Sequence, residues 1–252
     1  MHFKTLGTLE ATRGDIVLTP SAPKQRSVLC LLLTAPNEVI STGALFEELW
    51  GGNPPASAQT TLQTYIYQLR KRFGDGDAVW AARHLLVTRH GGYTLVVPED
   101  DIDVTRFETL TSAARTALDN GRLELAAHTL RTALSLWRGP ALADVTTGPR
   151  LEAYRVRLEE SRTHAVELKI KAEMAMGHHQ HLIGELKELV ATHSLNEWFH
   201  HQLMLALSRT GRRQEALEVY HNLRRILIEE LGIEPNTDMR RLHHGILTAD
   251  AV

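Results

Sequence analysis

The chain has 252 residues, a formal net charge of −2, 43% hydrophobic residues and 23% charged residues. These values are typical of a globular protein with one large domain or two small ones, and they exclude disordered, collagen-like and disulfide-stapled chains. The single cysteine, Cys30, cannot form an internal disulfide, which favours a reducing compartment. The N-terminus lacks a signal-peptide pattern, and no run approaches the roughly 18 apolar residues of a membrane span. We therefore expect a cytoplasmic protein with no membrane partner.

The first 50 residues predict a hairpin and two helices. A turn sequence at 13–15 separates two short apolar stretches, which is typical of a β-hairpin. Pro23 then begins a helix that ends before Pro36, because proline is tolerated in the first helical turn but not in the interior. A second helix over 42–49 ends at the glycine pair 51–52.

The next predicted element is an amphipathic helix over 57–73. Its apolar residues follow spacings of four, three and four, which places them on one face: Leu62, Ile66, Leu69 and Phe73. Residues 85–97 are β-rich on both sides of a His-Gly-Gly sequence. This pattern predicts a second hairpin, with Arg89 and His90 at its turn.

The rest of the chain carries almost only helical patterns. Three glycines mark turns between helices, and Gly177 and Gly211 are 34 residues apart, the period of a tetratricopeptide helix pair. The longer interval from Gly121 to Gly177 predicts an irregular insertion, which we place at 137–149. The last helix is expected at about 237–247.

The acidic segment that follows Pro98 is a plausible junction between two domains. Residues 1–98 have a net charge of +2 and the remainder −4, so any nucleic-acid surface must be a local patch. We predict a mostly α fold with a small β component. An N-terminal winged helix-turn-helix domain would occupy 1–98, and an all-α tetratricopeptide-like domain would occupy 99–252.

In a winged helix, the third helix lies in the DNA major groove and the hairpin reaches the neighbouring minor groove or backbone. We therefore predict that double-stranded DNA is contacted by polar and basic residues of the third helix and the hairpin turn: Thr60, Thr61, Gln63, Thr64, Tyr67, Gln68, Arg70, Lys71, Arg72, Arg89 and His90. The alternative for this face is an ordinary solvated helix surface. The basic end of the helix and Arg89 favour DNA.

The helix TTLQTYIYQLRKRF and the hairpin LVTRHGGYTL resemble the DNA-binding domain of OmpR-type response regulators. With ELWGGNPP, LSLWRGPALADV, GRRQEALEVYHNLR and ELGIEPNTDMRRLHHGIL, the chain resembles the Streptomyces antibiotic regulatory protein family over nearly its whole length. The resemblance implies a transcriptional activator of a secondary-metabolite (antibiotic) gene cluster, associated with the nucleoid. It also implies binding to direct repeats near the −35 element, self-association on DNA, and recruitment of RNA polymerase, for which loop 50–56 is a candidate contact.

Residue by residue, the resemblance maps base reading onto one face: Thr61, Thr64, Tyr67, Gln68 and Lys71. It maps a phosphate contact onto Arg70 and the wing arginine onto Arg89. OmpR-type regulators often carry arginine where this chain has Gln68. Glutamine favours paired hydrogen bonds to adenine, whereas arginine favours guanine.

Other chemistry has little support in the sequence. The 14 histidines show no convincing metal-ligand spacing, and adjacent carboxylates such as Glu47 and Glu48 are typical of helix surfaces. We expect no active site, no cofactor and no metal. No receiver domain or phosphate-binding loop is expected, so control would depend on protein amount or on a ligand. The alternatives are a repressor with the same DNA-binding domain, and a helical-repeat module that binds only proteins.

Overall fold

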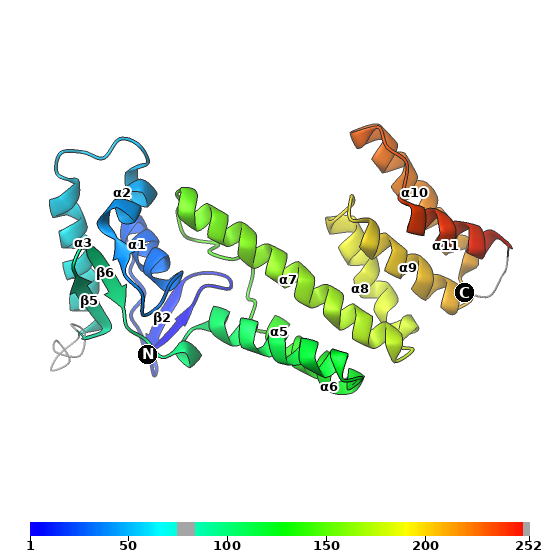
Figure 1. The fold of residues 1–252 in the computed structure, drawn as a ribbon, viewed down its shortest axis with the longest axis horizontal. Coiled ribbons are helices and arrows are strands. Elements are labelled where there is room, and N and C mark those ends of the chain that lie inside the picture. Colours follow the sequence, from blue (N-terminus) through cyan, green and yellow to red (C-terminus); the bar gives the residue numbers. More distant parts are fainter. Residues whose placement is uncertain (75–83, 249–252) are drawn as a thin grey trace. The chain divides into compact units, whose positions relative to one another are not determined.

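A computed structural model describes residues 1–74 and 84–248. The chain forms two compact units (Figure 1). The first comprises Met1–Thr116 and His128–Glu167, and the second comprises Ala117–Ala127 and the chain from Leu168. The expected domain boundary at residue 98 therefore stays a prediction, since the compact units follow a different division of the chain.

The first unit begins with a small antiparallel sheet. Its strands, in the order β1-β2-β3, are β1 (His2–Lys4), β2 (Glu10–Arg13) and β3 (Ile16–Val17). The predicted hairpin at 13–15 is confirmed as the β2–β3 connection, where Gly14 has a φ of 57°. Glycine suits this turn because it adopts positive φ without steric cost.

Three helices and a second sheet complete the winged-helix part of this unit. The helices are α1 (Pro23–Leu33), α2 (Thr42–Trp50) and α3 (Ala58–Phe73). The sheet has the order β4-β6-β5, with β4 (Ile40–Ser41), β5 (Leu86–Arg89) and β6 (Gly92–Leu95). The predicted helices and the wing hairpin are confirmed, and β4 is an addition that the sequence pattern did not reveal.

The core of the winged helix contains the apolar stripe that the sequence predicts on α3. Leu62, Ile66, Leu69 and Phe73 are at most 1% exposed. Phe3 packs edge-on against Phe73, with ring centroids 6.1 Å apart. Burial of these side chains holds α3 against α1 and the first sheet, and it leaves the opposite face of α3 toward solvent.

The remaining elements are helical, as predicted. They are α5 (Asp103–Asp119), α6 (Leu123–Leu134), α7 (Pro149–Ala175), α8 (His179–Thr192), α9 (Glu197–Arg209), α10 (Arg213–Leu231) and α11 (Thr237–Thr248). In the second unit, α10 ends at Leu231 and is followed by Gly232, which has a left-handed φ of 69°. Such a glycine is a common helix terminator, because its amide can satisfy carbonyls of the last turn.

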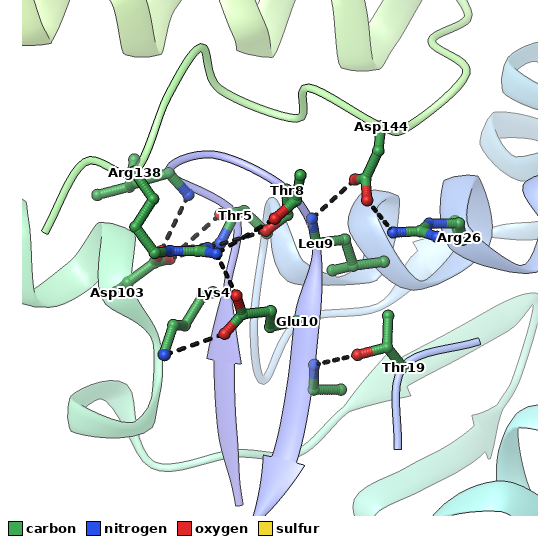
Figure 2. A network of polar contacts seen from close by, with 12 residues as sticks. Lys4, Thr5, Thr8, Leu9, Glu10, Thr19, Arg26, Asp103, Arg138 and Asp144 are labelled. Carbon is green, nitrogen blue, oxygen red and sulfur yellow. Dashed lines mark hydrogen bonds and ion pairs between the residues drawn. The ribbon is translucent and has the colours of Figure 1, made fainter. Parts of the chain in front are cut away.

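A buried carboxylate joins the start of α5 to the N-terminal sheet. Asp103 accepts hydrogen bonds from the backbone amides of Thr5 and Leu6, at 2.8–2.9 Å. Arg138 lies beside it and donates to the carbonyl of Thr8 at 2.8 Å (Figure 2). Burial raises the pKa of the Asp103 carboxyl, whereas the amide donors and Arg138 oppose the rise. The segment before β2 is thus held by side chains about 100 or more residues away in sequence.

The irregular segment between α6 and α7 continues this polar network. Asp144 accepts a hydrogen bond from the Leu9 amide at 2.8 Å and pairs with Arg26 of α1 (Figure 2). Ser27 donates its hydroxyl to the Thr146 carbonyl at 2.7 Å. The predicted insertion at 137–149 is therefore confirmed, and it is built into the same compact unit as the winged helix.

A second buried carboxylate caps helix α7. Glu48, which is 6% exposed, accepts from the backbone amides of Gly148, Arg150 and Leu151. These amides belong to the helix N-terminus, where the helix has no internal acceptors for them. The interpretation of this carboxylate as a surface charge is wrong, because α2 turns it toward α7. Its neighbour Glu47 is half-exposed, as expected, and pairs with the Arg150 side chain at 2.8 Å.

Candidate nucleic-acid interface

Most of the predicted DNA-contacting residues lie on the solvent face of α3. Seven of them are exposed: Thr60, Gln63, Thr64, Tyr67, Gln68, Lys71 and Arg72. Tyr67 is 64% exposed, although it is a large aromatic residue. Thr61 and Arg70 are only partly exposed. The structure thus places nine of the eleven predicted residues on α3, where they differ in solvent exposure.

Charge on α3 has a single sign. The helix contains no Asp or Glu, and its last turn carries Arg70, Lys71 and Arg72. Cations in the last turn also interact favourably with the helix dipole. A helix end with three cations and no carboxylate attracts phosphates, even though the net charge of the chain is slightly negative.

Arg70 makes contacts that the sequence did not predict. Its Nε donates to the Leu86 carbonyl and its guanidinium also donates to the Thr88 hydroxyl, each at 2.8 Å. Both acceptors belong to β5, so Arg70 ties α3 to the wing. Since these donors point inward, the geometry favours a positioning role over the direct phosphate contact that the family resemblance implies.

The neighbouring polar side chains differ in how many groups they leave free. The Thr64 hydroxyl donates to the Thr60 carbonyl at 2.9 Å, within the helix. The Arg72 guanidinium donates to the Thr19 carbonyl at 3.1 Å, which anchors that side chain to the loop after β3. Within the described part of the chain Lys71 forms no ion pair, and its ammonium is open to an incoming phosphate.

The wing is anchored at its tip. Arg89 pairs with Gly92 across the hairpin, and both Arg89 and His90 are exposed. The Gly91 carbonyl accepts a hydrogen bond from the Thr42 amide at 2.9 Å, at the start of α2. A Cβ added to Gly92 would lie 2.1 Å from the Ile40 carbonyl oxygen, so only glycine allows this close approach between β6 and β4.

Other candidate chemistry does not form a site in the residues that the structure describes. Across 1–74 and 84–248, no group of three or more His, Cys, Asp or Glu side chains is placed to hold a metal ion. Cys30 is 1% exposed, and burial raises the pKa of its thiol, so it behaves as a core residue. None of the helices in these two ranges is sufficiently long and apolar to cross a membrane.

An exposed helix with cations and no carboxylate, beside an anchored basic wing, defines a winged-helix regulator of transcription. Comparisons with known proteins agree. Residues 17–95 match the family model described as "Transcriptional regulatory protein, C terminal", and residues 102–247 match "Bacterial transcriptional activator domain". The chain belongs to the Streptomyces antibiotic regulatory protein family, whose members are transcriptional regulators and not enzymes.

Individual relatives support this assignment over the whole chain. The chain is 42% identical to Regulatory protein DnrI of Streptomyces peucetius, over 99% of this chain and 93% of that protein. It is 36% identical to Regulatory protein AfsR of Streptomyces griseus over 99% of this chain. The match covers only 25% of the length of AfsR.

A solved structure supports the fold class. Mycobacterium tuberculosis EmbR, in complex with a low affinity phosphopeptide, is similar to this chain with a TM-score of 0.92 at 32% identity. The similarity covers 100% of this chain and 66% of the EmbR chain. The predicted combination of a winged helix and an all-α tetratricopeptide-like region is therefore confirmed.

Proposed function

We propose that this protein activates a secondary-metabolite (antibiotic) gene cluster by binding direct repeats near the −35 element and recruiting RNA polymerase. The observation that carries the proposal is the carboxylate-free, solvent-facing side of α3 beside the wing tip. The similarity to Regulatory protein DnrI over nearly the full length of both chains supports the choice of a pathway regulator.

In the proposed complex, α3 lies in the major groove and Arg89 enters the adjacent minor groove. Thr61, Thr64, Tyr67 and Gln68 supply hydrogen-bond donors and acceptors for base edges, and Lys71 supplies a cation for the backbone. An arginine suits a narrow minor groove because the negative potential is strongest there.

Two protomers bind side by side on a direct repeat and self-associate there, so that the complex presents one directional surface to the polymerase. Loop 50–56 is the proposed contact with RNA polymerase, and its residues 51–56 are all exposed. It begins at the last residue of α2 and precedes α3, so it lies close to the proposed DNA surface along the chain.

Selection of bound duplexes from a randomised pool, followed by footprinting, tests the DNA part of the proposal. A direct repeat with half-sites one or two helical turns apart supports tandem protomers. An inverted repeat would contradict the side-by-side arrangement, and no enrichment would favour a module that binds only proteins. In vitro transcription from the selected site then separates the two regulatory outcomes, since an activator raises the transcript yield and a repressor lowers it.

A further inference from the structure

Two glutamines from different helices meet at the edge of the proposed DNA-reading face. Gln25 lies in the first turn of α1 and is partly buried, whereas Gln68 lies in the C-terminal half of α3 and is exposed. The Gln25 side-chain amide donates from Nε2 to Oε1 of Gln68. A role of this contact in base selection rests on the proposed function of α3 in base reading.

The contact fixes the direction of the Gln68 amide. A glutamine side chain has an accepting oxygen at one end and an NH₂ group with two donors at the other. Its terminal torsion is broad and roughly two-fold, so one hydrogen bond is enough to select which end faces a neighbour. Because Gln25 donates to Oε1, the Nε2 group of Gln68 points away from α1.

The residues around the two glutamines do not favour the opposite orientation of the Gln68 amide. Both amides line an open groove of about 480 Å³. Its other lining residues are Ile16, Val17, Leu18, Ser21, Lys71 and Arg72. Among the described residues that line this groove there is no carboxylate. No such group therefore accepts a hydrogen bond from Gln68 Nε2 and reverses the amide. Gln68 is exposed, so a base edge can approach it from the solvent side.

We propose that Gln25 is a specificity-determining residue that acts through Gln68. A free glutamine prefers adenine, because Oε1 accepts from adenine N6 while Nε2 donates to N7. Because Gln25 holds Oε1 toward α1, the first of these bonds, from adenine N6 to Oε1, is lost, and Nε2 remains as a double donor. Guanine presents two acceptors, O6 and N7, on its major-groove edge. Gln68 therefore reads guanine in this protein, although glutamine alone predicts adenine.

Duplex selection with three proteins tests the inference directly. Wild type is expected to enrich guanine over adenine at one position, by on the order of tenfold. Gln25→Ala releases Oε1, and the preference at that position moves to adenine. Gln25→Glu keeps the length of the side chain but only accepts, so it takes an N–H of Gln68 and turns Oε1 outward. This variant should then select a base that donates, which is cytosine or adenine, by a similar factor.

Matched variants separate base reading from general damage. Gln25→Glu in a Gln68→Ala background should change nothing at this position, because the effect requires both side chains. Ser21→Ala, in the same groove, should keep the wild-type preference. Thermal unfolding of each variant confirms that the fold is intact. The negative charge of Gln25→Glu is expected to lower affinity for all sequences alike, so the measured quantity is the base preference at one position.

The outcomes are distinguishable. Folded Gln25→Glu protein that still selects the wild-type base would overturn the inference while leaving DNA binding in place, and so would adenine selection by wild type. Wild-type protein that selects no sequence would instead remove the proposed function, and this inference with it.

Discussion

Two polar regions of the first unit differ in where their hydrogen-bonding groups are satisfied. The exposed face of α3 leaves Tyr67 and Lys71 open to solvent. The segment between α6 and α7 directs its polar groups inward, where Asp144 pairs with Arg26 and receives the Leu9 amide. The comparison shows that polar composition does not define a binding surface. Internal partners decide which polar residues remain available to DNA.

The same contrast predicts which measurement each residue affects. Removing a carboxylate that accepts buried backbone amides leaves those amides without partners, which lowers the free energy of unfolding. Removing an exposed α3 side chain should weaken DNA binding and leave unfolding unchanged. Variants of both regions, each with a matched control, test this division between stability and DNA binding.

Asp103→Ala should lower the free energy of unfolding by roughly 3 kcal/mol, because buried amides at Thr5 and Leu6 lose their acceptor. The matched control is Asp100→Ala, because Asp100 is exposed and lies three residues earlier in the chain. That control should change stability by less than about 0.5 kcal/mol. Urea unfolding followed by circular dichroism measures both. Equal stability of the two variants would show that the inward network does not hold the unit together.

Glu48→Ala should cost about 2 kcal/mol, because it removes the carboxylate that caps the first turn of α7. Glu47→Ala removes an ion pair between two half-exposed side chains and should cost at most about 0.5 kcal/mol. Adjacent residues of the same type thus give a fourfold difference in effect. A larger loss for Glu47→Ala in the same unfolding measurement would contradict the assignment of the cap.

Local patterns were sufficient for most elements and for one face of the site. Pro23 and the four-three-four spacing of the α3 apolar stripe predicted two helices, since both signals act within a few residues. Strand β4 has only two residues and exists through pairing with Gly92 and Tyr93, about 50 residues later. No local periodicity can reveal such a strand.

The contacts of the polar residues could not be predicted from the sequence either, because their partners also lie far away along the chain. Periodicity placed Arg70 near the helix surface, but its inward direction depends on where β5 lies. Glu47 and Glu48 are indistinguishable as letters, and only the position of α7 separates their roles. Sequence therefore predicted which face of α3 is open, whereas the structure was needed to say which of its side chains are committed elsewhere.

Arg89 and Arg70 allow the same comparison within the proposed DNA interface, because Arg89 is exposed and Arg70 is engaged by β5. Arg89→Ala should weaken binding by about 1 kcal/mol across many sequences and reduce the slope of affinity against salt by about one, because it removes a cation near the backbone. Arg70→Ala should weaken binding through a displaced wing, with a smaller change in the salt slope, since its donors hold Leu86 and Thr88. Titrations at several salt concentrations measure both quantities. A reduction of the salt slope in Arg70→Ala as large as that in Arg89→Ala would instead support a direct phosphate contact by Arg70.

His200 in the second unit extends the comparison to a buried polar group that is only partly satisfied. It is 2% exposed, and its Nε2 lies 3.0 Å from the Ser194 carbonyl, whereas Nδ1 has no partner among the described residues. Burial lowers the pKa of this histidine below its ordinary value, and the hydrogen bond to Ser194 opposes the shift. The unfolded chain therefore binds more protons than the folded chain as the pH falls through about 6.5.

This difference in bound protons makes the folded protein less stable at low pH, and the effect is the smallest that we expect. The free energy of unfolding should fall as the pH drops from 8 through about 6.5 toward 5.5, and it should level off above that window. His200→Gln cannot take up the proton, so its stability should vary less over the same range, even though the variant starts from a lower value at pH 8. His128→Gln changes an exposed histidine and should keep the wild-type slope. Identical pH slopes for wild type and His200→Gln would show that protonation of this buried ring does not contribute to the pH dependence of stability. They would also show that the unpaired Nδ1 is accommodated without cost.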